Sequence, residues 1–251
     1  MAKAMSDPFK KLYDEISSRK AKPRDFEPYT GGNGRIDRAV DLILNEDFPR
    51  SGTLLDVGGA TGNLGYALRN NFQTRWTLDI SKVCKEPAEA KGNKFLCCNV
   101  DTDGFCDWND NGIESEEIDL IVALDFIEHI IDPMKFAREC HRVLKPGGKV
   151  LINTPNIQFW RHLHSLVVEG KFPHTSGDSD VYHGGHVAFY NVNDMVQIFS
   201  QANGFTDTRM HTRGLTPEPP PPIWVSLMAK AEFAPSIQLS YPDLIFSARK
   251  Q

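Results

Sequence analysis

The segment from Leu54 to Leu68, which reads LLDVGGATGNLGYAL, constrains the fold of this chain more than any other. An apolar run ends in Asp56, a loop of small residues follows, and the next residues have the spacing of a helix. Glycine has no side chain to hold a ligand away from the backbone, and it tolerates the tight turn that joins a strand to a helix. Three glycines lie in this loop: Gly58, Gly59 and Gly62. We therefore expect a nucleotide-type cofactor site, with an ordinary turn as the alternative.

The spacing of these glycines argues against a dinucleotide cofactor. The G-x-G-x-x-G fingerprint needs its third glycine where this chain has Asn63, and Gly62 comes one residue earlier. Hydride transfer is therefore disfavoured.

Two further apolar runs each end in a polar residue. Residues 74–80 (TRWTLDI) alternate as a strand and end in Asp79 and Ile80, about 20 residues after the glycines. A carboxylate at the tip of this strand can accept both ribose hydroxyls, whereas a 2′-phosphate would require Arg. Residues 94–100 (KFLCCNV) predict a third strand that carries Asn99 and Val100 at its end.

A fourth strand is predicted at residues 118–124 (IDLIVAL), ending in Leu124. The sequence DFIEHIIDP follows, then an amphipathic helix through Arg142, and then RVLKPGGKVLINTPN. Pro133 suits the first turn of a helix because its missing N–H would have no partner there, and Pro146 with the two glycines after it cannot continue one.

Taken in order, these motifs resemble the class I S-adenosylmethionine (SAM) dependent methyltransferases over residues 53 to about 233. The glycine loop resembles the D-x-G-x-G-x-G loop of that family, with Ala60 in place of the middle glycine. The resemblance implies an α/β fold with a doubly wound, mostly parallel seven-stranded sheet, strand order 3-2-1-4-5-7-6, and a helical insertion after strand five. The last two strands are expected at about 205–212 and 223–233, after a helix at 192–202.

The resemblance also implies SAM as the cofactor. In open α/β sheets a ligand lies beyond the carboxyl ends of the strands, and the predicted contacts lie at such ends. Asn99 stands where the family usually has an Asp or Asn beside the adenine amino group. The residues expected to contact SAM are Asp56, Gly58, Gly59, Ala60, Gly62, Asp79, Ile80, Asn99, Val100 and Leu124.

The organisation that we expect has three parts. Residues 1–35 form a lid or accessory segment, residues 36–233 form the SAM-binding domain, and residues 234–251 form a tail. Within the domain, residues 155–190 form an insertion on the acceptor side, because loops on a rigid scaffold carry specificity.

Histidines mark the acceptor side. The insertion holds five of the eight: His162, His164, His174, His183 and His186. The setting HVAFYNVNDM around His186 resembles a His-x-x-(Phe/Tyr) turn of small-molecule methyltransferases, and Asp125, Glu128 and His129 form a D-x-x-E-H group after strand four. Methyl transfer from a sulfonium requires positioning, removal of the acceptor's proton and exclusion of water. Histidine titrates near neutrality, so His129 and His186 are the candidate catalytic bases.

The same D-x-x-E-H group with a distant histidine also resembles two metal-assisted subfamilies, the ubiquinone-pathway O-methyltransferases and the small-RNA 2′-O-methyltransferases. Carboxylates and imidazoles at Asp125, Glu128, His129 and His186 could hold Mg²⁺ or a related ion. Because Glu-His after strand four also occurs in members without a metal, we do not favour a metal here.

Composition narrows the partners. A net charge of −5 gives no general attraction to nucleic acid or anionic membranes. No segment resembles a signal peptide or a membrane span, so we expect a cytoplasmic protein. Five cysteines without zinc-ribbon spacing predict free thiols.

The leading hypothesis is transfer of a methyl group from SAM to an O- or N-nucleophile of a small molecule. The alternatives are a metal-assisted methyltransferase acting on RNA or protein, and a non-catalytic SAM-binding scaffold. The sequence does not indicate the oligomeric state.

Overall fold

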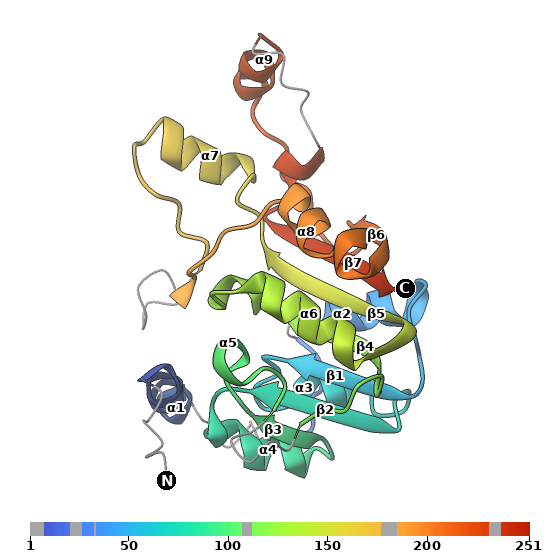
Figure 1. Ribbon diagram of the computed structural model, residues 1–251. Helices are drawn as coiled ribbons and strands as arrows, with labels where there is room; N and C mark the ends of the chain where they lie inside the picture. Colours follow the sequence, from blue (N-terminus) through green and yellow to red (C-terminus); the bar gives the residue numbers. More distant parts are fainter. Residues whose placement is uncertain (1–7, 21–26, 33, 107–111, 177–184, 231–236) are drawn as a thin grey trace.

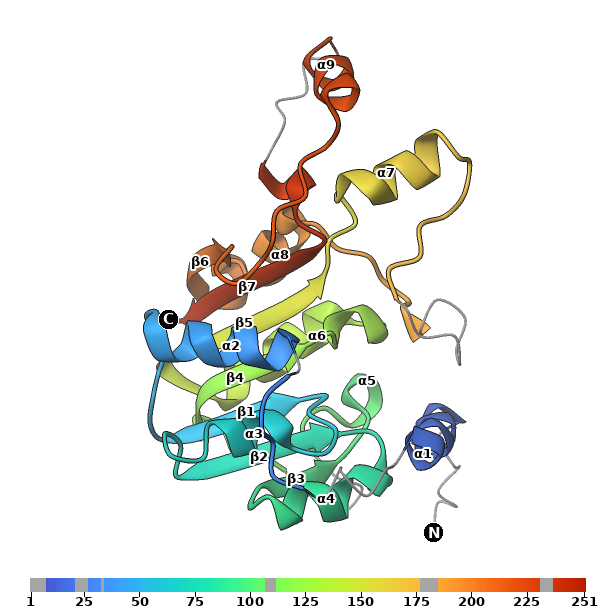
Figure 2. The same ribbon diagram turned by 180° about the vertical axis from the view of Figure 1, so that it is seen from behind.

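A mixed seven-stranded sheet forms the centre of the computed structural model, which describes residues 8–20, 27–32, 34–106, 112–176, 185–230 and 237–251 (Figures 1 and 2). The strand order is β3-β2-β1-β4-β5-β7-β6, and β7 runs antiparallel to both of its neighbours. The predicted fold class and strand order are therefore confirmed. The strands are β1 Thr53–Val57, β2 Thr74–Asp79, β3 Lys94–Cys97, β4 Ile118–Leu124, β5 Leu144–Pro155, β6 Phe205–His211 and β7 Asp243–Lys250.

Helices cover both faces of this sheet (Figures 1 and 2). The α-helices are α1 Pro8–Lys20, α2 Gly34–Asn45, α3 Asn63–Ala67, α4 Lys85–Ala90, α5 Val100–Asp103, α6 Pro133–Val143, α7 Trp160–Val167, α8 Val192–Ile198 and α9 Pro222–Lys230. Short 3₁₀ turns lie at η2 Lys82–Cys84, η3 Ile127–His129, η5 Gln201–Asn203 and η6 Ile237–Ser240. Among the described residues no helix is long and apolar enough to cross a membrane.

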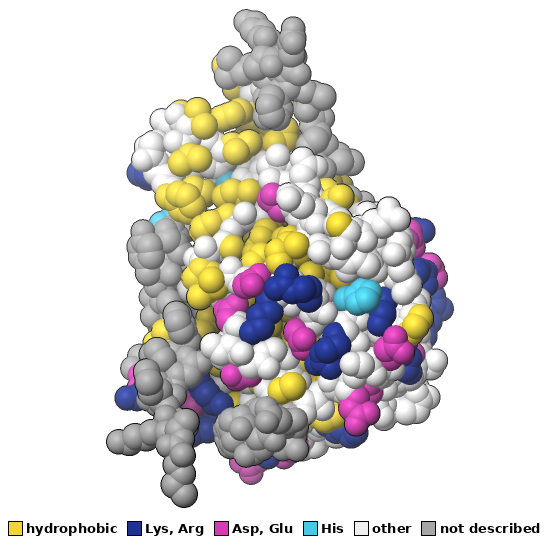
Figure 3. Space-filling model, viewed as in Figure 1, with side chains coloured by type: hydrophobic (Ala, Val, Ile, Leu, Met, Phe, Trp, Pro, Cys, Tyr) yellow, Lys and Arg dark blue, Asp and Glu magenta, His cyan; other side chains and the backbone are white. Residues whose placement is uncertain are grey.

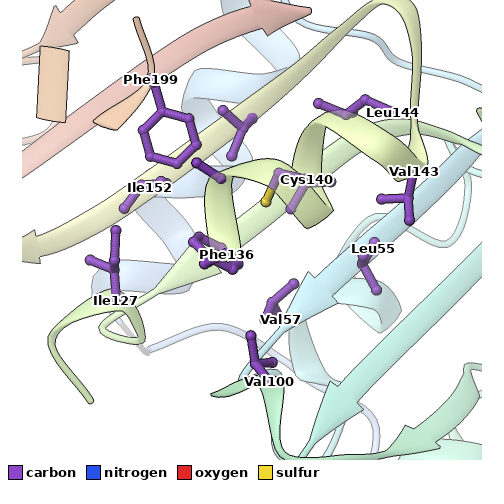
Figure 4. Close-up of a cluster of buried hydrophobic side chains, with 14 of the residues drawn as sticks. Leu55, Val57, Val100, Ile127, Phe136, Cys140, Val143, Leu144, Ile152 and Phe199 are labelled. Carbon is purple, nitrogen blue, oxygen red and sulfur yellow. The ribbon is translucent and has the colours of Figure 1, made fainter. Parts of the chain in front are cut away.

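Alternate residues of the central strands supply two cores. On β1, Leu54 packs on the α2 and α3 side, while Leu55 and Val57 pack on the α6 and α8 side. The larger cluster includes Phe136 of α6 and Phe199 after α8 (Figure 4). Because both faces of the central strands are covered, β1 and β4 are apolar almost throughout. All five cysteines are free of disulfides, as expected.

Helix α6 forms where the sequence predicts it. Asp132 is its N-cap and accepts a hydrogen bond from Lys135 N at 2.8 Å, and Pro133 occupies the first turn. Its buried residues, Phe136, Ala137, Cys140 and Val143, share one face. The helix therefore packs this face into the larger of the two cores.

The predicted final strand at 223–233 is wrong. Residues 222–230 form α9, and residues 231–236 lie outside the described part of the chain. The last strand is β7, which lies between β5 and β6, so the expected tail at 234–251 contains a strand of the sheet. Its apolar core is only the run Leu244, Ile245 and Phe246, and the polar Ser247 and Lys250 are buried because they find hydrogen-bond partners. A longer apolar run upstream was therefore the stronger but misleading pattern.

Three other predicted elements are shorter than expected. Helix α3 ends at Ala67 instead of Asn71, and α8 ends at Ile198 instead of Ala202. Strand β3 ends at Cys97, so Val100 begins α5 instead of ending a strand. The insertion at 155–190 contains α7, which stands away from the sheet (Figures 1 and 2). Tyr182 and His183 of the insertion, and Phe26 of the leading segment, lie outside the described residues.

Candidate functional site

The glycine loop turns sharply at the carboxyl end of β1 and is attached to β2. The backbone N–H groups of Gly58 and Gly59 donate to Leu78 O at 2.8 and 3.2 Å. Gly58 and Gly62 have φ values of 72° and 73°, and Ala60 also has a positive φ, of 45°. Ala60 thus adopts a conformation that favours glycine, in agreement with its alignment to the middle glycine of the family loop.

The neighbours of these glycines explain why they lack side chains. A Cβ on Gly59 would lie 2.4 Å from Asp56 Oδ2, and a Cβ on Gly62 would lie 2.3 Å from Asn93 Nδ2. A Cβ on Gly58 would lie 2.7 Å from Cδ2 of Phe126, the residue that precedes η3. The glycines are therefore required by packing within the protein as well as by any ligand. The last contact also brings the glycine loop against the turn that carries Glu128 and His129.

Asp79 lies at the tip of β2 with both carboxylate oxygens held. Oδ2 accepts from Ala60 N at 3.0 Å, and Oδ1 accepts from Ser81 N at 2.9 Å. Burial raises the pKa of Asp79 to about 6, although these backbone N–H groups oppose the rise. Asp14 of α1 accepts from Ser81 Oγ and Lys82 N, both at 2.9 Å, so the leading segment reaches the β2 tip.

Asp56 is buried beneath the glycine loop, with 4% of its surface exposed. Burial, and then the charge of Asp79, raise the pKa of Asp56 to about 8, so it holds a proton at neutral pH. A neutral acid at this position can donate a hydrogen bond, which a carboxylate cannot do.

The remaining predicted cofactor contacts lie around the same edge. The side-chain oxygen of Asn99 caps α5 by accepting from Asp101 N at 3.1 Å, so it is already engaged in a cap. Val100 is buried, and Ile80 and Leu124 are half-buried. The contact of these residues with SAM stays a prediction.

The two candidate bases meet although they are far apart in the sequence. The segment after Gly185 docks on η3, with Val187 N and Ala188 N both donating to Glu128 O, at 2.8 and 3.2 Å. The rings of His129 and His186 pack edge to face with their centroids 4.8 Å apart. The structure therefore brings these two histidines into contact, and their catalytic role stays a prediction.

Hydrogen bonds orient both rings. Nδ1 of His129 lies 3.2 Å from Gly185 O, and a carbonyl oxygen can only accept, so this contact places the hydrogen of a neutral ring on Nδ1. Tyr13 OH of α1 lies 3.5 Å from the same Nδ1. Nδ1 of His186 lies 2.7 Å from Thr175 Oγ1, which can donate or accept.

Glu128 lies beneath the histidines with 1% of its surface exposed. Its Oε2 accepts from Thr154 Oγ1 at 2.9 Å, whereas Oε1 has no hydrogen-bond partner among the described residues and lies 4.0 Å from His186 Nε2. Burial, followed by the charge of Asp125, raises the pKa of Glu128 to about 8. One ligand atom from each of Glu128, His129 and His186 falls within 4.8 Å of the others, so these three could hold a metal ion.

Asp125 does not join this group of ligand atoms. It has a positive φ of 49° and is held by Arg35 Nη1 and by Asn153 Nδ2, each at 2.5 Å. The four-residue metal set considered from the sequence is therefore reduced to three.

Sequence reasoning missed Arg35, Asn153 and Thr154 as members of the site. Asn153 and Thr154 are polar residues at the end of the apolar β5 strand, which is the same pattern that identified Asp79 at the end of β2. Arg35 had no comparable signal, because only the docking of α2 brings it to Asp125.

Most other histidines of the insertion lie elsewhere. His162 Nδ1 contacts Asn156 O at 2.9 Å, and His164 lies on α7 beside Glu169 and Trp224. His174 is exposed. Of the insertion histidines that the structure describes, His186 is the one that joins the pocket.

The sequence and the fold match known proteins. The profile of the methyltransferase-domain family matches residues 31–209, which include the glycine loop, the β2 tip and both histidines. The chain belongs to the class I SAM-dependent methyltransferase family.

Relatives agree with this assignment. The chain is 32% identical over 120 residues to the ubiquinone biosynthesis O-methyltransferase of Coxiella burnetii, and this alignment covers 45% of this chain and 48% of the relative. It is 28% identical over 188 residues to malonyl-[acyl-carrier protein] O-methyltransferase 1 of the same organism, and that alignment covers 72% of this chain and 58% of the relative. The match thus spans about half the length of these curated relatives. A SAM-dependent methyltransferase from Thermotoga maritima shares the fold at 14% identity, with a TM-score of 0.60 over 96% of this chain and 99% of the other.

The buried acid predicts how stability depends on pH. Because the pKa of Glu128 rises from 4.5 to about 8 in the folded protein, the native state keeps a proton that the unfolded state releases between these values. The free energy of unfolding should therefore fall as pH rises through this window, by up to about 1.4 kcal/mol per pH unit. Glu128→Gln removes this group, so at pH 8 the variant should have a higher Tm than the wild type.

Thermal unfolding from pH 5 to pH 9 in the presence of a chelator measures this difference. Glu89→Gln on α4 is the matched control, because Glu89 is exposed and pairs only loosely with Lys85 at 3.9 Å. If the Tm of Glu128→Gln and of the wild type changed equally with pH, ionisation of Glu128 would not lower the free energy of unfolding, and this prediction would be wrong.

Proposed function

We propose that this chain transfers the methyl group of SAM to an oxygen or nitrogen nucleophile of a small molecule, with His129 as the general base. The observation that carries the proposal is the orientation of His129, whose Nδ1 is directed at Gly185 O, so that in the neutral ring the basic nitrogen is Nε2. The contact between Phe126 and Gly58 supports it, because it places the turn bearing this histidine against the loop expected to bind SAM.

In the proposed complex the chain would orient the two reactants. Asp79 would accept the ribose hydroxyls of SAM, and the adenine would lie toward Asn99 and Val100. Arg35 and Asp125, paired across the mouth of the site, offer a cation and an anion to the amino-acid end of SAM. This role would explain why Arg35 of α2 and Asp125 after β4 are both partly exposed to solvent although they pair with each other.

The reaction itself needs little from the protein beyond position and a base. The acceptor's O–H or N–H would donate its proton to His129 Nε2 while its lone pair attacks the methyl carbon in line with the carbon–sulfur bond. That bond breaks, and its electron pair remains on sulfur, giving S-adenosylhomocysteine. His186, packed edge to face on His129, would hold that ring in place or serve as the base itself.

The names of the relatives favour oxygen as the acceptor atom. Both the ubiquinone biosynthesis and the malonyl-[acyl-carrier protein] relatives are O-methyltransferases. A net charge of −5 remains an argument against a nucleic acid as acceptor.

A metal-assisted reaction is the second candidate, and one observation favours it. Glu128 Oε1 is buried without a hydrogen-bond partner among the described residues and is directed toward His186. Glu128, His129 and His186 would hold the ion, which would polarise the acceptor oxygen and favour its ionised form. Their mixed oxygen and nitrogen atoms suit a borderline divalent ion such as Mn²⁺ better than Mg²⁺.

Cofactor binding, methyl transfer and the effect of a chelator together separate the histidine-base mechanism, the metal-assisted mechanism and a non-catalytic scaffold. Calorimetry with SAM and with S-adenosylhomocysteine tests cofactor binding, and incubation with labelled SAM and panels of phenols, acids and amines tests transfer. A histidine base predicts transfer that survives a chelator, whereas a metal site predicts loss that Mn²⁺ or Mg²⁺ restores. SAM binding without transfer to any panel, to RNA or to protein would favour a non-catalytic scaffold.

A further inference from the structure

Two consecutive residues at the end of β5 each hold one acid of the D-x-x-E-H group. Asn153 Nδ2 donates to Asp125 Oδ1 at 2.5 Å, and Thr154 Oγ1 donates to Glu128 Oε2 at 2.9 Å. Both β5 residues are buried, with exposed fractions of 3% and 1%. Buried polar side chains are stable where they have hydrogen-bond partners, so each acid also accounts for the burial of the residue that holds it.

The pleat of β5 directs these two side chains to opposite faces of the sheet. Leu151, two residues before Asn153, packs in the cluster on the α2 side. Ile152, two residues before Thr154, packs in the larger cluster on the α6 and α8 side. Because residues two apart on a strand share a face, the first acid is held toward α2 and the second toward α6.

Asn153 contacts the backbone of Asp125 as well as its carboxylate. Asp125 N donates to Asn153 O at 2.9 Å. The φ of Asp125 is 49°, in a region that residues other than glycine seldom adopt, and such conformations persist where the surrounding contacts impose them. Arg35 of α2 donates to the other carboxylate oxygen at 2.5 Å. The chain itself therefore sets the direction of this carboxylate.

The carboxylate held in this way can still bind a cationic group. A carboxylate offers about four lone-pair sites, and Asn153 and Arg35 each use one of those on Asp125. The side chains of Asp125 and Arg35 are 29% and 46% exposed, so a ligand at the carboxyl end of β4 can reach them. An N–H group of a ligand could therefore contact Asp125 without displacing either partner.

The charges around Asp125 favour a cation over an anion. Burial, followed by the charge of Asp125, raises the pKa of Asp243 on β7, although Arg38 and Arg35 oppose the rise. A cation beside Asp125 would weaken this repulsion between the two acids. In Figure 3 acidic and basic side chains lie close to one another on the face shown, so recognition of a charged group depends on individually oriented residues.

We propose, building on the function proposed above, that Asn153 is a positioning residue that directs Asp125 to the ammonium group of SAM. Its amide keeps this acid on the α2 side, next to Arg35, where the amino-acid end of the cofactor is proposed to bind. Thr154 keeps Glu128 on the other side, beneath the two histidines. The end of β5 thereby assigns one acid of the D-x-x-E-H group to the cofactor and leaves the other to the acceptor.

Four ligands that share the adenosine and the sulfur and differ at the amino-acid end test this role. S-adenosylhomocysteine carries an ammonium and a carboxylate, and 5′-methylthioadenosine carries neither. The aminopropyl analogue, 5′-deoxy-5′-(3-aminopropylthio)adenosine, carries only the ammonium. The carboxypropyl analogue, 5′-deoxy-5′-(3-carboxypropylthio)adenosine, carries only the carboxylate. Calorimetry on the full chain measures the affinity for each of them.

Asn153→Ala should weaken binding of the two ligands that carry the ammonium by about fivefold or more, because their ionic hydrogen bond depends on an oriented carboxylate. It should leave the affinity for the carboxypropyl analogue and for 5′-methylthioadenosine unchanged. Asn153→Leu, which keeps the volume of the side chain but cannot donate, should give the same pattern and replaces the alanine variant if that variant does not fold.

Two further variants show whether Asn153 acts through Asp125. Asp125→Asn should weaken the same two ligands, and adding Asn153→Ala to it should have little further effect, because both residues act on one contact. Asn156→Ala is the matched control, since Asn156 is also buried at the end of β5 and its amide donates to Tyr241 O at 2.9 Å. This control should lower the Tm and leave all four affinities unchanged.

Three results would overturn the positioning role. Asn153→Ala could weaken all four ligands equally, which is the result of a purely structural role. It could leave all four affinities unchanged, or its effect could add in full to that of Asp125→Asn. A wild type that does not bind S-adenosylhomocysteine rejects the proposed function, whereas a wild type that binds it without a loss specific to the ammonium in Asn153→Ala rejects the role of Asn153 alone.

Discussion

His129→Ala is expected to lower turnover by about 100-fold or more and to leave SAM affinity unchanged. General bases contribute about 10² to 10⁴ to a rate, and His129 is oriented through Nδ1 so that Nε2 is the basic atom. Its contacts include Gly185, His186 and Tyr13, so we expect its removal to leave the Asp79 end of the site intact. Steady-state kinetics on the acceptor found by profiling, together with calorimetry for SAM, measure the two effects separately.

His141→Ala is the matched control, because His141 lies on α6 against Phe205 and away from the pocket. His186→Ala should also spare SAM affinity and lower turnover, and the histidine with the larger effect is the base. Wild-type turnover should fall in the acidic range where histidine takes up a proton. If neither histidine variant changes turnover, the acceptor is held elsewhere, and the aromatic residues of the leading segment would be the next candidates.

Asp79→Ala is expected to weaken SAM binding by at least 10-fold. Hydrogen bonds to a charged group contribute about 1.5–3 kcal/mol, and the Asp79 carboxylate is presented at the β2 tip by two backbone N–H groups that fix its oxygens. Since the pKa of Asp79 is raised to about 6, the carboxylate that accepts the ribose hydroxyls is replaced by the neutral acid below that pH. SAM affinity of the wild type should therefore fall as pH is lowered through about 6, and this fall should be absent from Asp79→Ala.

Asp41→Ala provides the control, because Asp41 is an exposed carboxylate on α2 that pairs with Arg213. Calorimetric titrations of SAM from pH 5 to pH 8 give both the affinity and its pH dependence. Unchanged affinity in Asp79→Ala would show that the ribose is bound by other groups, and the assignment of the β2 tip would be wrong.

The sequence predicted that the proposed cofactor contacts lie at one sheet edge because these residues follow strand ends, and their contact with SAM stays a prediction. Asp56, the glycines and Asp79 each follow a short apolar run, and parallel strands place their carboxyl ends at one edge. The errors came where burial depends on partners instead of local pattern. Strand β7 was missed because Ser247 and Lys250 interrupt its apolar run, and their burial is made favourable by partners distant in the sequence, which include His211 and Leu144 O.

The proposed acceptor side of the site also combines residues that the sequence could nominate with contacts that only the packed chain decides. The sequence nominated His129 and His186, but their meeting depends on two backbone hydrogen bonds to Glu128 O from residues almost 60 positions later. It also nominated Asp125 as a ligand, and the structure pairs it with Arg35 and Asn153 instead. Sequence spacing cannot decide between such partners, because the choice depends on how α2 and β5 pack beside β4.

The sequence by itself determined the family, because short motifs have a geometry that neighbouring residues set, and the resemblance to that family then implied the strand order. Tertiary structure alone decided which side chains surround Glu128, where the last strand lies and which apolar residues stay exposed. The raised pKa of Glu128 and the exposure of Leu166 and Val167 on α7 result from burial or its absence, which is a property of the packed chain. Local pattern fixes elements because backbone hydrogen bonding and hydrophobic periodicity act over a few residues, whereas desolvation and contacts across the sheet exist only once the elements are assembled.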